Sequence, residues 1–312
     1  MTSDGQFLRK IGLIVGNASQ VLDLSNLEVE FVVRAGDFDA PNTAYIRIFN
    51  PAPDTIKNIQ QEYKQVSLQA GYVNGNFSQI FSGDIMQVKT GKLENVTRYL
   101  DLLCSDGDLF HSYSFTNIVI APNQANSAQI AALEKSANAS GVTLDNSAKS
   151  ALDITGGILP RGKVRFGLSK VLTNDLATRA NATWWIEQGV LKAVPLTGYL
   201  SSEAVVINSL TGQIGVPEAT EQGVTVRTLL NPLIKVGGRI KLNNNEITQT
   251  QINQQVGFPT IQSIAYIANL DPTGLYTAIV VEHQGKSRGN PFYTDIIALA
   301  IDQSSGKVQA YG

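Results

Sequence analysis

The chain has 312 residues, enough for two or three domains with substantial buried cores. Charged residues make up 16% of it, against roughly 25% in an average globular protein, and hydrophobic residues make up 43%. The formal net charge of -2 excludes a broadly basic protein that attracts nucleic acid. The low charged fraction fits either a neutral soluble domain or a protein that buries much of its surface in an assembly, and composition leaves both open.

Cysteine and targeting signals are sparse. Cys104 stands alone, so no disulfide can form within the chain, and its apolar neighbours predict a buried residue. The first residues show no signal peptide, and no apolar run approaches the ~20 residues of a membrane-spanning helix. We therefore expect synthesis in a cytoplasm and no stable membrane insertion.

The first 112 residues predict a small twisted β-barrel or sandwich. Alternating and apolar runs predict strands at residues 11–15, 27–33, 44–49, 65–72, 77–88 and 96–104. The fifth of these strands is expected to break at Gly83. Asn74-Gly75 signals a hairpin turn, because both central positions of that turn need positive φ. Asp54 or Thr55 is expected to cap a single short helix.

Residues 113–200 predict an α+β middle domain. The expected elements are helices at residues 127–139 and 169–182 and a hairpin of strands at residues 184–187 and 190–194. Most of residues 145–160 is expected to be loop, given its turn-forming residues. Trp184 and Trp185 are neighbours on a strand and point to opposite faces, so they cannot form one exposed carbohydrate platform.

From about residue 201 the chain again predicts strands. They lie at residues 224–229, 239–242, 260–268, 276–283, 294–301 and 307–311. The first and last thirds of the chain are therefore alike in element type, with the mixed segment between them. They cannot be aligned residue by residue as an internal repeat.

The stretch from residue 211 to residue 242 combines turn signals with short alternating runs. Asn231-Pro232 ends one strand, because proline has no N–H to give to a ladder, and Gly237-Gly238 turns the chain again. The stretch holds no nucleophile, base or set of metal ligands, which predicts a surface shaped to fit another protein. The candidate interface residues are Gly212, Gly215, Pro217, Asn231, Pro232, Gly237 and Gly238.

Residues 157–163 match most of a phosphate-binding loop. Gly157 and Gly162-Lys163 have the required spacing, but the next residue, Val164, has no hydroxyl to bind magnesium. Pro160 lies inside the motif, and no clear strand precedes it. We therefore interpret the motif as an ordinary loop and expect no cofactor.

The other polar candidates also lack the partners that catalysis or metal binding requires. The two histidines, His111 and His283, have no cluster of His, Cys or carboxylates at ligand spacing. Asp106 and Asp108 flank a glycine, but the remaining oxygen ligands of a calcium loop are missing, so we interpret them as a turn. We predict no catalytic residue, no metal site and no enzymatic activity.

Three groups of short motifs follow one another along the chain. They comprise residues 41–50, 66–72 and 80–85; residues 212–217, 223–226, 229–232 and 237–238; and residues 281–285 and 288–290. In order and spacing they resemble the central baseplate hub proteins of contractile-tailed bacteriophages. The resemblance covers most of the chain and is weakest over residues 109–159. Lys286 departs from the family pattern, in which an acidic residue follows the glycine.

The resemblance implies a structural protein of the virion, located in the tail baseplate and assembled in the bacterial host cytoplasm. It implies two tube-like β-barrel domains, at residues 1–112 and 201–312, on either side of the α+β domain at residues 113–200. Three chains would then present six similar barrels to the sixfold tail tube and a threefold face to the central spike. Viral DNA would pass through the centre of this homotrimer without specific binding.

The implied partners are further copies of the chain, the tail tube protein, the central spike protein and other baseplate proteins, with the tape measure protein left open. Two alternatives stay open, a tail-associated cell-wall hydrolase and the hub of a genome-free contractile injection particle. A glycosidase needs two placed carboxylates in a cleft, and no segment nominates such a pair. A channel that lets DNA slide should not have a basic lining; candidate acids are Glu28, Glu30, Asp84 and Glu94.

Overall fold

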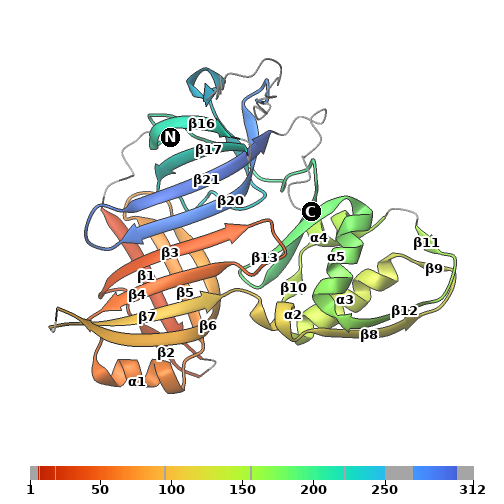
Figure 1. The fold of residues 1–312 in the computed structure, drawn as a ribbon, viewed down its shortest axis with the longest axis horizontal. Helices are drawn as coiled ribbons and strands as arrows, with labels where there is room; N and C mark the ends of the chain where they lie inside the picture. Colours follow the sequence, from red (N-terminus) through yellow and green to blue (C-terminus); the bar gives the residue numbers. More distant parts are fainter. Residues whose placement is uncertain are drawn as a thin grey trace, which may run out of the picture.

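The computed structural model describes residues 6–300 apart from 7, 18, 95, 155–156, 221–222 and 250–269. These residues form a large, mostly antiparallel sheet and a smaller lobe of helices and short strands beside it (Figure 1). The prediction of a mainly β fold with a smaller α+β part is confirmed. No helix in the described ranges is long and apolar enough to span a membrane.

The N-terminal half of the large sheet contains all the strands that the sequence predicts there. Its elements are β1 (Arg9–Gly16), β2 (Val21–Asp23), β3 (Glu28–Gly36), β4 (Thr43–Phe49), α1 (Pro53–Gln61), β5 (Gln65–Tyr72), β6 (Phe77–Leu93) and β7 (Thr97–Ser105). The strands pair in the order β3-β4-β7-β6-β5-β1-β2, with antiparallel neighbours throughout. Alternate residues face the core, as expected for a sheet with one buried face.

Two local predictions in this half are wrong. β6 does not break at Gly83 but runs on for 17 residues. Glycine serves close packing there, because a Cβ at this position would lie 2.5 Å from the carbonyl oxygen of Ser105. Neither Asp54 nor Thr55 caps helix α1, which begins at Pro53. Proline suits the first helical position, where its missing N–H would have had no partner in the helix.

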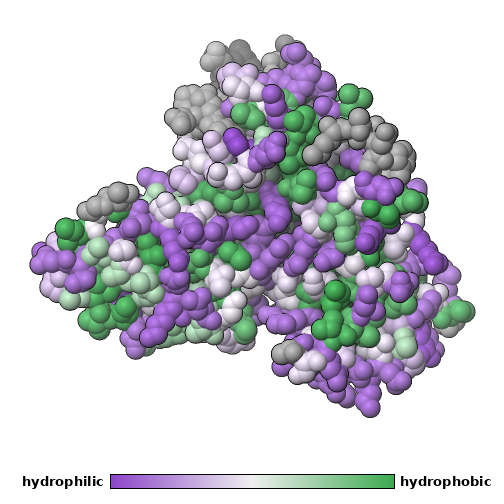
Figure 2. All heavy atoms as spheres, turned by 180° about the vertical axis from the view of Figure 1, so that it is seen from behind, coloured by the Kyte–Doolittle hydropathy of each residue, from purple (hydrophilic) through white to green (hydrophobic). Residues whose placement is uncertain are grey.

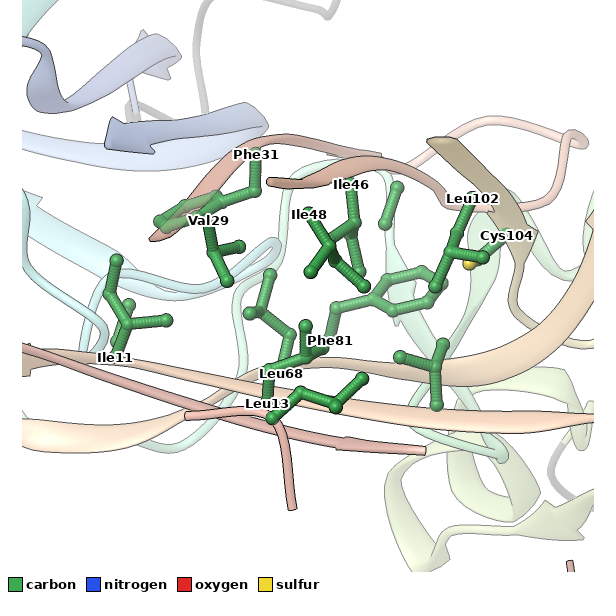
Figure 3. Packing of buried hydrophobic residues seen from close by; sticks show 14 of the residues in the cluster. Ile11, Leu13, Val29, Phe31, Ile46, Ile48, Leu68, Phe81, Leu102 and Cys104 are labelled. Atoms are coloured by element: carbon green, nitrogen blue, oxygen red, sulfur yellow. The ribbon is translucent and has the colours of Figure 1, made fainter. Parts of the chain in front are cut away.

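The N-terminal half of the sheet curls over a hydrophobic core (Figure 3). Ile46 and Ile48 on β4 point towards Leu68 on β5 and Leu13 on β1, and all four are completely buried. Cys104 on β7 lies in the same core, so its predicted burial is confirmed. Each such aliphatic side chain contributes about 1.5–3 kcal/mol on burial, which makes this core the main source of stability in this half.

The C-terminal half adds seven described strands and one short 3-10 helix. They are β15 (Val205–Val206), β16 (Gln213–Thr220), β17 (Gly223–Leu229), β18 (Arg239–Lys241), the 3-10 helix η2 (Asn244–Glu246), β19 (Thr248–Gln249), β20 (Leu275–Lys286) and β21 (Phe292–Ala300). The strands predicted at residues 224–229, 239–242, 276–283 and 294–301 are confirmed to within a few residues. The strands predicted at residues 260–268 and 307–311 lie outside the described residues.

β3 and β20 pair with each other and join the two halves into one sheet of fourteen described strands. The order is β19-β16-β17-β21-β20-β3-β4-β7-β6-β5-β1-β2, and β18 pairs with β15 and β20 beside this path. The path has two ends, so the described strands form an open sheet and no closed barrel. A strand has only two edges, and β3 uses its edges for β4 and β20, so it cannot also close a barrel on β1.

The lobe consists of four helices and seven short strands among its described residues. Its helices are α2 (Asp108–Ser112), α3 (Ser127–Ala139), α4 (Asn146–Leu152) and α5 (Ser169–Ala180). Its strands are β8 (Phe115–Ile120), β9 (Gln124–Ala125), β10 (Thr143–Leu144), β11 (Ile158–Leu159), β12 (Lys163–Leu168), β13 (Ala182–Glu187) and β14 (Val190–Pro195). The two predicted helices and the predicted hairpin, now β13 and β14, are confirmed.

Part of the predicted loop at residues 145–160 is helical instead. Asp145 is the N-cap of α4, and its side chain accepts a hydrogen bond from the backbone N–H of Asn146. Ala148 and Leu152, one helical turn apart, are buried in the core of the lobe. The sequence Asp145-Asn146 is as suitable for capping a helix as for forming a turn, and the apolar spacing that follows it decides between the two.

Strand β13 connects the lobe to the large sheet. Trp184 packs in the core of the lobe, and Trp185 packs with Ile234 and Val236 in the core of the C-terminal half. The predicted opposite orientation of the two indole rings is therefore confirmed, and both rings are buried. One strand thus contributes to two cores, which fixes the lobe against the sheet.

Candidate assembly interface

The first three candidate interface residues lie on or beside the edge strand β16. Gly212 has φ +101° and is buried beside Gln6 and Leu229. Gly215 has φ +74° and is exposed, with open space around its Cα, where the pairing of β16 with β17 shifts register. Pro217 is buried at the same irregularity. Only Gly215 of these three is therefore exposed to a partner.

The Asn231-Pro232 corner is held by contacts within the chain. The backbone N–H of Asn231 donates to Thr294 Oγ1 at 3.0 Å, and its side-chain oxygen accepts from the N–H of Leu233 at 3.1 Å. Pro232 is buried, whereas Leu233 is exposed. The corner thus turns the chain inward after β17 and leaves only Leu233 as an apolar contact for another protein.

Gly237 and Gly238 have mainly internal roles. Gly237 has φ +74°, and a Cβ there would lie 2.5 Å from Cη2 of Trp185. Its N–H donates to Ala278 O at 2.8 Å, and its carbonyl accepts from Leu200 N at 2.8 Å. Gly238 accepts from Ala278 N at 3.0 Å. The predicted positive φ in this pair is confirmed at Gly237, and the pair fits the loop against β13 and β20.

The acidic turn after β7 fixes the lobe to the sheet, a role that the sequence interpretation missed. Both carboxylate oxygens of Asp106 accept backbone N–H groups, from Gln188 and from Gly189, the latter at 3.0 Å. Burial raises the pKa of Asp106 to about 6, although these two hydrogen bonds favour the anion. Nearby, Asn42 donates to the carbonyl of Ile186 at 2.7 Å. These contacts hold the β13–β14 turn on the sheet.

Asp106 and Asp84 line a cleft of about 400 Å³ between the sheet and the lobe. Burial raises the pKa of both carboxyl groups, and the neighbouring charge of Asp108 adds to the effect at Asp84. Perturbed carboxyls in a cleft are a recognised sign of acid–base chemistry. Because both oxygens of Asp106 are occupied by backbone N–H groups, only Asp84 is free to act, and one carboxyl does not make a glycosidase pair.

Both histidines lie in packed surroundings. His111 stacks on Trp184, with ring centroids 5.4 Å apart, and its Nδ1 lies 3.9 Å from Asp39 Oδ1. Burial lowers the pKa of His111, and burial together with Lys235 lowers the pKa of His283 to about 4. Neutral imidazoles that pack and hydrogen-bond are structural. Within the described ranges, no group of three His, Cys, Asp or Glu side chains is placed to hold a metal ion.

The phosphate-loop match does not adopt the required geometry. Gly162 lies just before β12, and Lys163 is the first residue of that strand. A phosphate-binding loop instead leads from a strand into the N-terminus of a helix, where backbone N–H groups point at the ligand. The interpretation of this motif as an ordinary loop is consistent with its fold.

The outward face of the large sheet carries two cross-strand rows of charges, which we call the charged face. One row runs across four strands and the other across four strands of the same sheet. The members of the charged face are Arg227, Asp295, Glu282 and Arg34 in the first row and Lys286, Glu30, Arg47 and Asp101 in the second. Four cations thus face four carboxylates, and the face has no net charge from these rows.

Every cation of the charged face has a carboxylate partner. The closest N–O distances are 2.6 Å for Arg34–Glu282, 2.7 Å for Lys286–Glu30 and 2.6 Å for Arg227–Asp295. The fourth pair, Arg47–Asp101, is bidentate at 2.7 and 2.9 Å. Glu30, one of the predicted channel acids, is therefore on this face and neutralised by Lys286, the residue that departs from the family pattern.

Comparisons with known proteins agree in direction. A family model described as baseplate hub gp41 matches residues 49–256. No curated protein matches the chain by sequence. The 43 kDa tail protein of prophage MuSo2 from Shewanella oneidensis is similar in structure at 6% identity, with 94% of this chain and 97% of that chain covered and a TM-score of 0.56.

Two further solved structures have the same overall fold. The tail protein from Neisseria meningitidis MC58 has 10% identity and a TM-score of 0.55, with 94% of this chain and 96% of that chain covered. The E. coli c3393 protein has 11% identity and a TM-score of 0.54, with 94% and 78% covered. It is described as a type VI secretion component with structural similarity to the T4 bacteriophage tail proteins gp27 and gp5. At such identities the likeness shows a shared fold.

Proposed function

The chain belongs to the baseplate hub gp41 family, and from this we propose that three copies form the hub that joins the tail tube to the central spike of a contractile tail. It is a structural component of a phage tail baseplate. We further propose that residues 1–112 and 201–312 act as two tube-like β domains, with residues 113–200 as a middle domain. Three chains would then present six such units to a sixfold tube.

The charged face is the observation that carries the proposed channel. Its strands β17, β21, β20, β3, β4 and β7 lie side by side and span both halves of the sheet (Figure 1). Each phosphate–cation contact adds salt-dependent affinity, so a surface that lets DNA slide needs cations that are already occupied. The paired rows of the charged face meet this need, which supports its assignment as a wall of the channel.

Unpaired strand edges support ring closure between copies. Beyond Asp84, β6 pairs only with β7 among the described strands, so its edge from Met86 to Leu93 is open. At the other end of the sheet, β19 covers β16 only at Glu218 and Ala219. Open edges invite pairing with another chain, and a head-to-tail ring joins one kind of edge to the other.

Mass photometry of the purified chain, followed by cryo-electron microscopy of the intact tail tip, tests the proposed trimer. We expect three copies per tail tip and, where the chain assembles alone, a species of about three times the 33.6 kDa of one chain. The charged face should line the central channel. Six copies per particle, or a channel lined by another surface, would overturn the proposal.

The further partners that we propose are the tail tube protein, the spike protein and other baseplate proteins, and genome ejection is their common function. A genome-free injection particle would use the same hub, and cryo-electron microscopy of an empty particle would identify it. We propose no enzymatic activity. Peptidoglycan hydrolysis by the purified chain that is lost in an Asp84→Asn variant would contradict this, since Asp84 is the free carboxyl of the cleft.

A further inference from the structure

The two-stranded ribbon β8–β12 is apolar on its outward face. The exposed fractions are 50% for Phe115, 74% for Val119, 66% for Val164 and 75% for Phe166. Val164 lies directly opposite Val119, and the rings of Phe115 and Phe166 meet edge to face with centroids 4.7 Å apart. We call these four side chains the apolar ribbon face. On the side of the lobe where β8 and β12 lie, Figure 2 shows hydrophobic atoms gathered and bordered by hydrophilic ones.

The other face of the ribbon, covered by α3 and α5, is partly polar. Arg165 points inward to an ion pair with Asp175 on α5 and a 3.2 Å hydrogen bond to Gln129 on α3. Thr116 shares hydroxyl hydrogen bonds with Ser136 and Ser169. In β12 the usual pattern of an exposed sheet is therefore reversed, with arginine inside and valine and phenylalanine outside.

A slip of one residue would remove this reversal, so the register needs a reason. Moving β12 by one residue would bury Val164 and Phe166 and expose Lys163 and Arg165. The Arg165–Asp175 pair and the Gln129 hydrogen bond hold the observed register instead. A lone soluble lobe gains nothing from exposing four large apolar side chains, whereas a lobe that buries them against another protein does.

The charge around the ribbon indicates what kind of partner it fits. The segment from residue 161 to 179 has a single carboxylate, on Asp175, and its cations are Arg161, Lys163, Arg165, Lys170 and Arg179. Burial, Arg165 and Arg179 together lower the pKa of Lys163, which is the sign of a local excess of positive charge. We propose that the apolar ribbon face binds an apolar segment of a different protein, bordered by carboxylates, in the assembled particle.

Three other occupants fit less well. Two copies of this chain meeting through the same face would bring their cations together. Single-stranded nucleic acid needs cations beside the exposed rings, but Arg165 points to the opposite face and is occupied by Asp175. A lipid surface would leave the outer edges of β8 and β12 without hydrogen-bond partners, since each pairs only with the other among the described strands.

Cysteine labelling of the full chain tests burial of the face. The native Cys104 is completely buried, so Val164→Cys and Phe166→Cys variants each add one accessible thiol. We expect a water-soluble maleimide to label both in the isolated protein and to label them about tenfold more slowly or less in purified particles, because the interface must open first. An inward Ile120→Cys variant on the same ribbon is the matched control and should stay unlabelled in both states.

Photo-crosslinking identifies the occupant. The full chain with p-benzoylphenylalanine in place of Phe166 is assembled into particles, irradiated and analysed by mass spectrometry. A crosslink to an apolar, carboxylate-flanked segment of another protein supports the proposal. A crosslink to a second copy of this chain or to nucleic acid, or labelling of Val164→Cys at the free rate in particles, overturns it. This test rests on the proposed function, whose own failure is distinct, because the chain would then be absent from purified particles.

Discussion

The charged face and the apolar ribbon face are both outward faces of antiparallel strands, but their chemistry is opposite. On β3 and β4 the outward residues Arg34 and Arg47 pair with carboxylates, and the inward residues Phe31 and Ile46 fill the core. On β12 the apolar Val164 faces outward. A face whose charges cancel in place can stay in contact with water, whereas an apolar face with charges behind it is suited to being covered.

The cores explain how one chain supports both arrangements. The buried apolar core of the N-terminal half includes residues from β3, β4, β5 and β7, so inversion there would cost the whole core. The core of the lobe lies among its helices and the β13–β14 hairpin, and includes Phe110, Leu133 and Leu191. No described residue of β8 or β12 belongs to it. The ribbon is therefore free to present its apolar side outward without weakening the lobe.

The comparison requires sheet and lobe to be one body, and Gly237→Val should break this most strongly. The valine would collide with Trp185 and would be strained at φ +74°, so we expect a loss of about 3–5 kcal/mol in the free energy of unfolding. Urea unfolding followed by tryptophan fluorescence measures it, because both tryptophans lie on β13.

Gly215→Val is the matched control for that change. Gly215 has the same φ of +74° but open space around it, so only backbone strain of about 1–2 kcal/mol should appear. Equal losses in the two variants would mean that the Trp185 contact does not hold the lobe. If Gly237→Val does not fold, Gly237→Ala gives the same comparison with a smaller side chain.

Asp106 should make the attachment of the lobe depend on pH. Its folded pKa of about 6 lies above its ordinary value of 3.8, so folding favours the protonated form. The stability of the native protein relative to an Asp106→Asn variant should therefore be highest below pH 4 and fall by about 2–3 kcal/mol as the pH rises through 6. Urea midpoints from pH 4 to 8 measure it. Asp108→Asn controls for the lost charge, and a difference that rises with pH would contradict the assignment.

Within the charged face, the buried pair should matter more than the exposed one. Arg47→Gln leaves the buried carboxylate of Asp101 without its partner, and we expect a loss of about 1–3 kcal/mol. Although burial raises the pKa of Asp101, its hydrogen bonds and charge interaction with Arg47 lower it overall. Arg34 is 69% exposed, so Arg34→Gln should cost about 0.5 kcal/mol or less. Thermal midpoints of both variants decide; similar losses would show that burial does not distinguish the pairs.

Local signals in the sequence are sufficient for most of the sheet but not for the charged face. Alternation at residues 27–33 and 44–49 predicts strands and their buried sides. The pairing of Arg34 with Glu282 joins residues that are 248 positions apart, and no local pattern contains it. The open sheet has the same origin, because whether β3 pairs with β20 or closes a barrel depends on long-range contacts.

The lobe shows why the candidate sites were only partly predictable. The turn at Asp106 was predicted, but its two N–H donors come from a hairpin more than 80 residues later. Residues 163–166 alternate polar and apolar, yet alternation does not say which side faces the protein. Most of the predicted interface residues, Gly237 among them, carry the turn chemistry that a packed internal loop needs as much as a docking surface does.

The smallest effect should come from the apolar ribbon face itself. Val164→Thr keeps the shape of the side chain, and Phe166→Thr removes a ring that is 75% exposed. Exposed positions away from cores, caps and buried pairs usually change stability by about 0.5 kcal/mol or less, so both thermal midpoints should stay close to that of the native protein. Ile120→Thr, inward and buried on the same ribbon, should cost about 1–3 kcal/mol. If the outward variants were as destabilised as Ile120→Thr, the outward side chains would serve the fold of the isolated chain, and the contrast with the charged face would no longer indicate a partner.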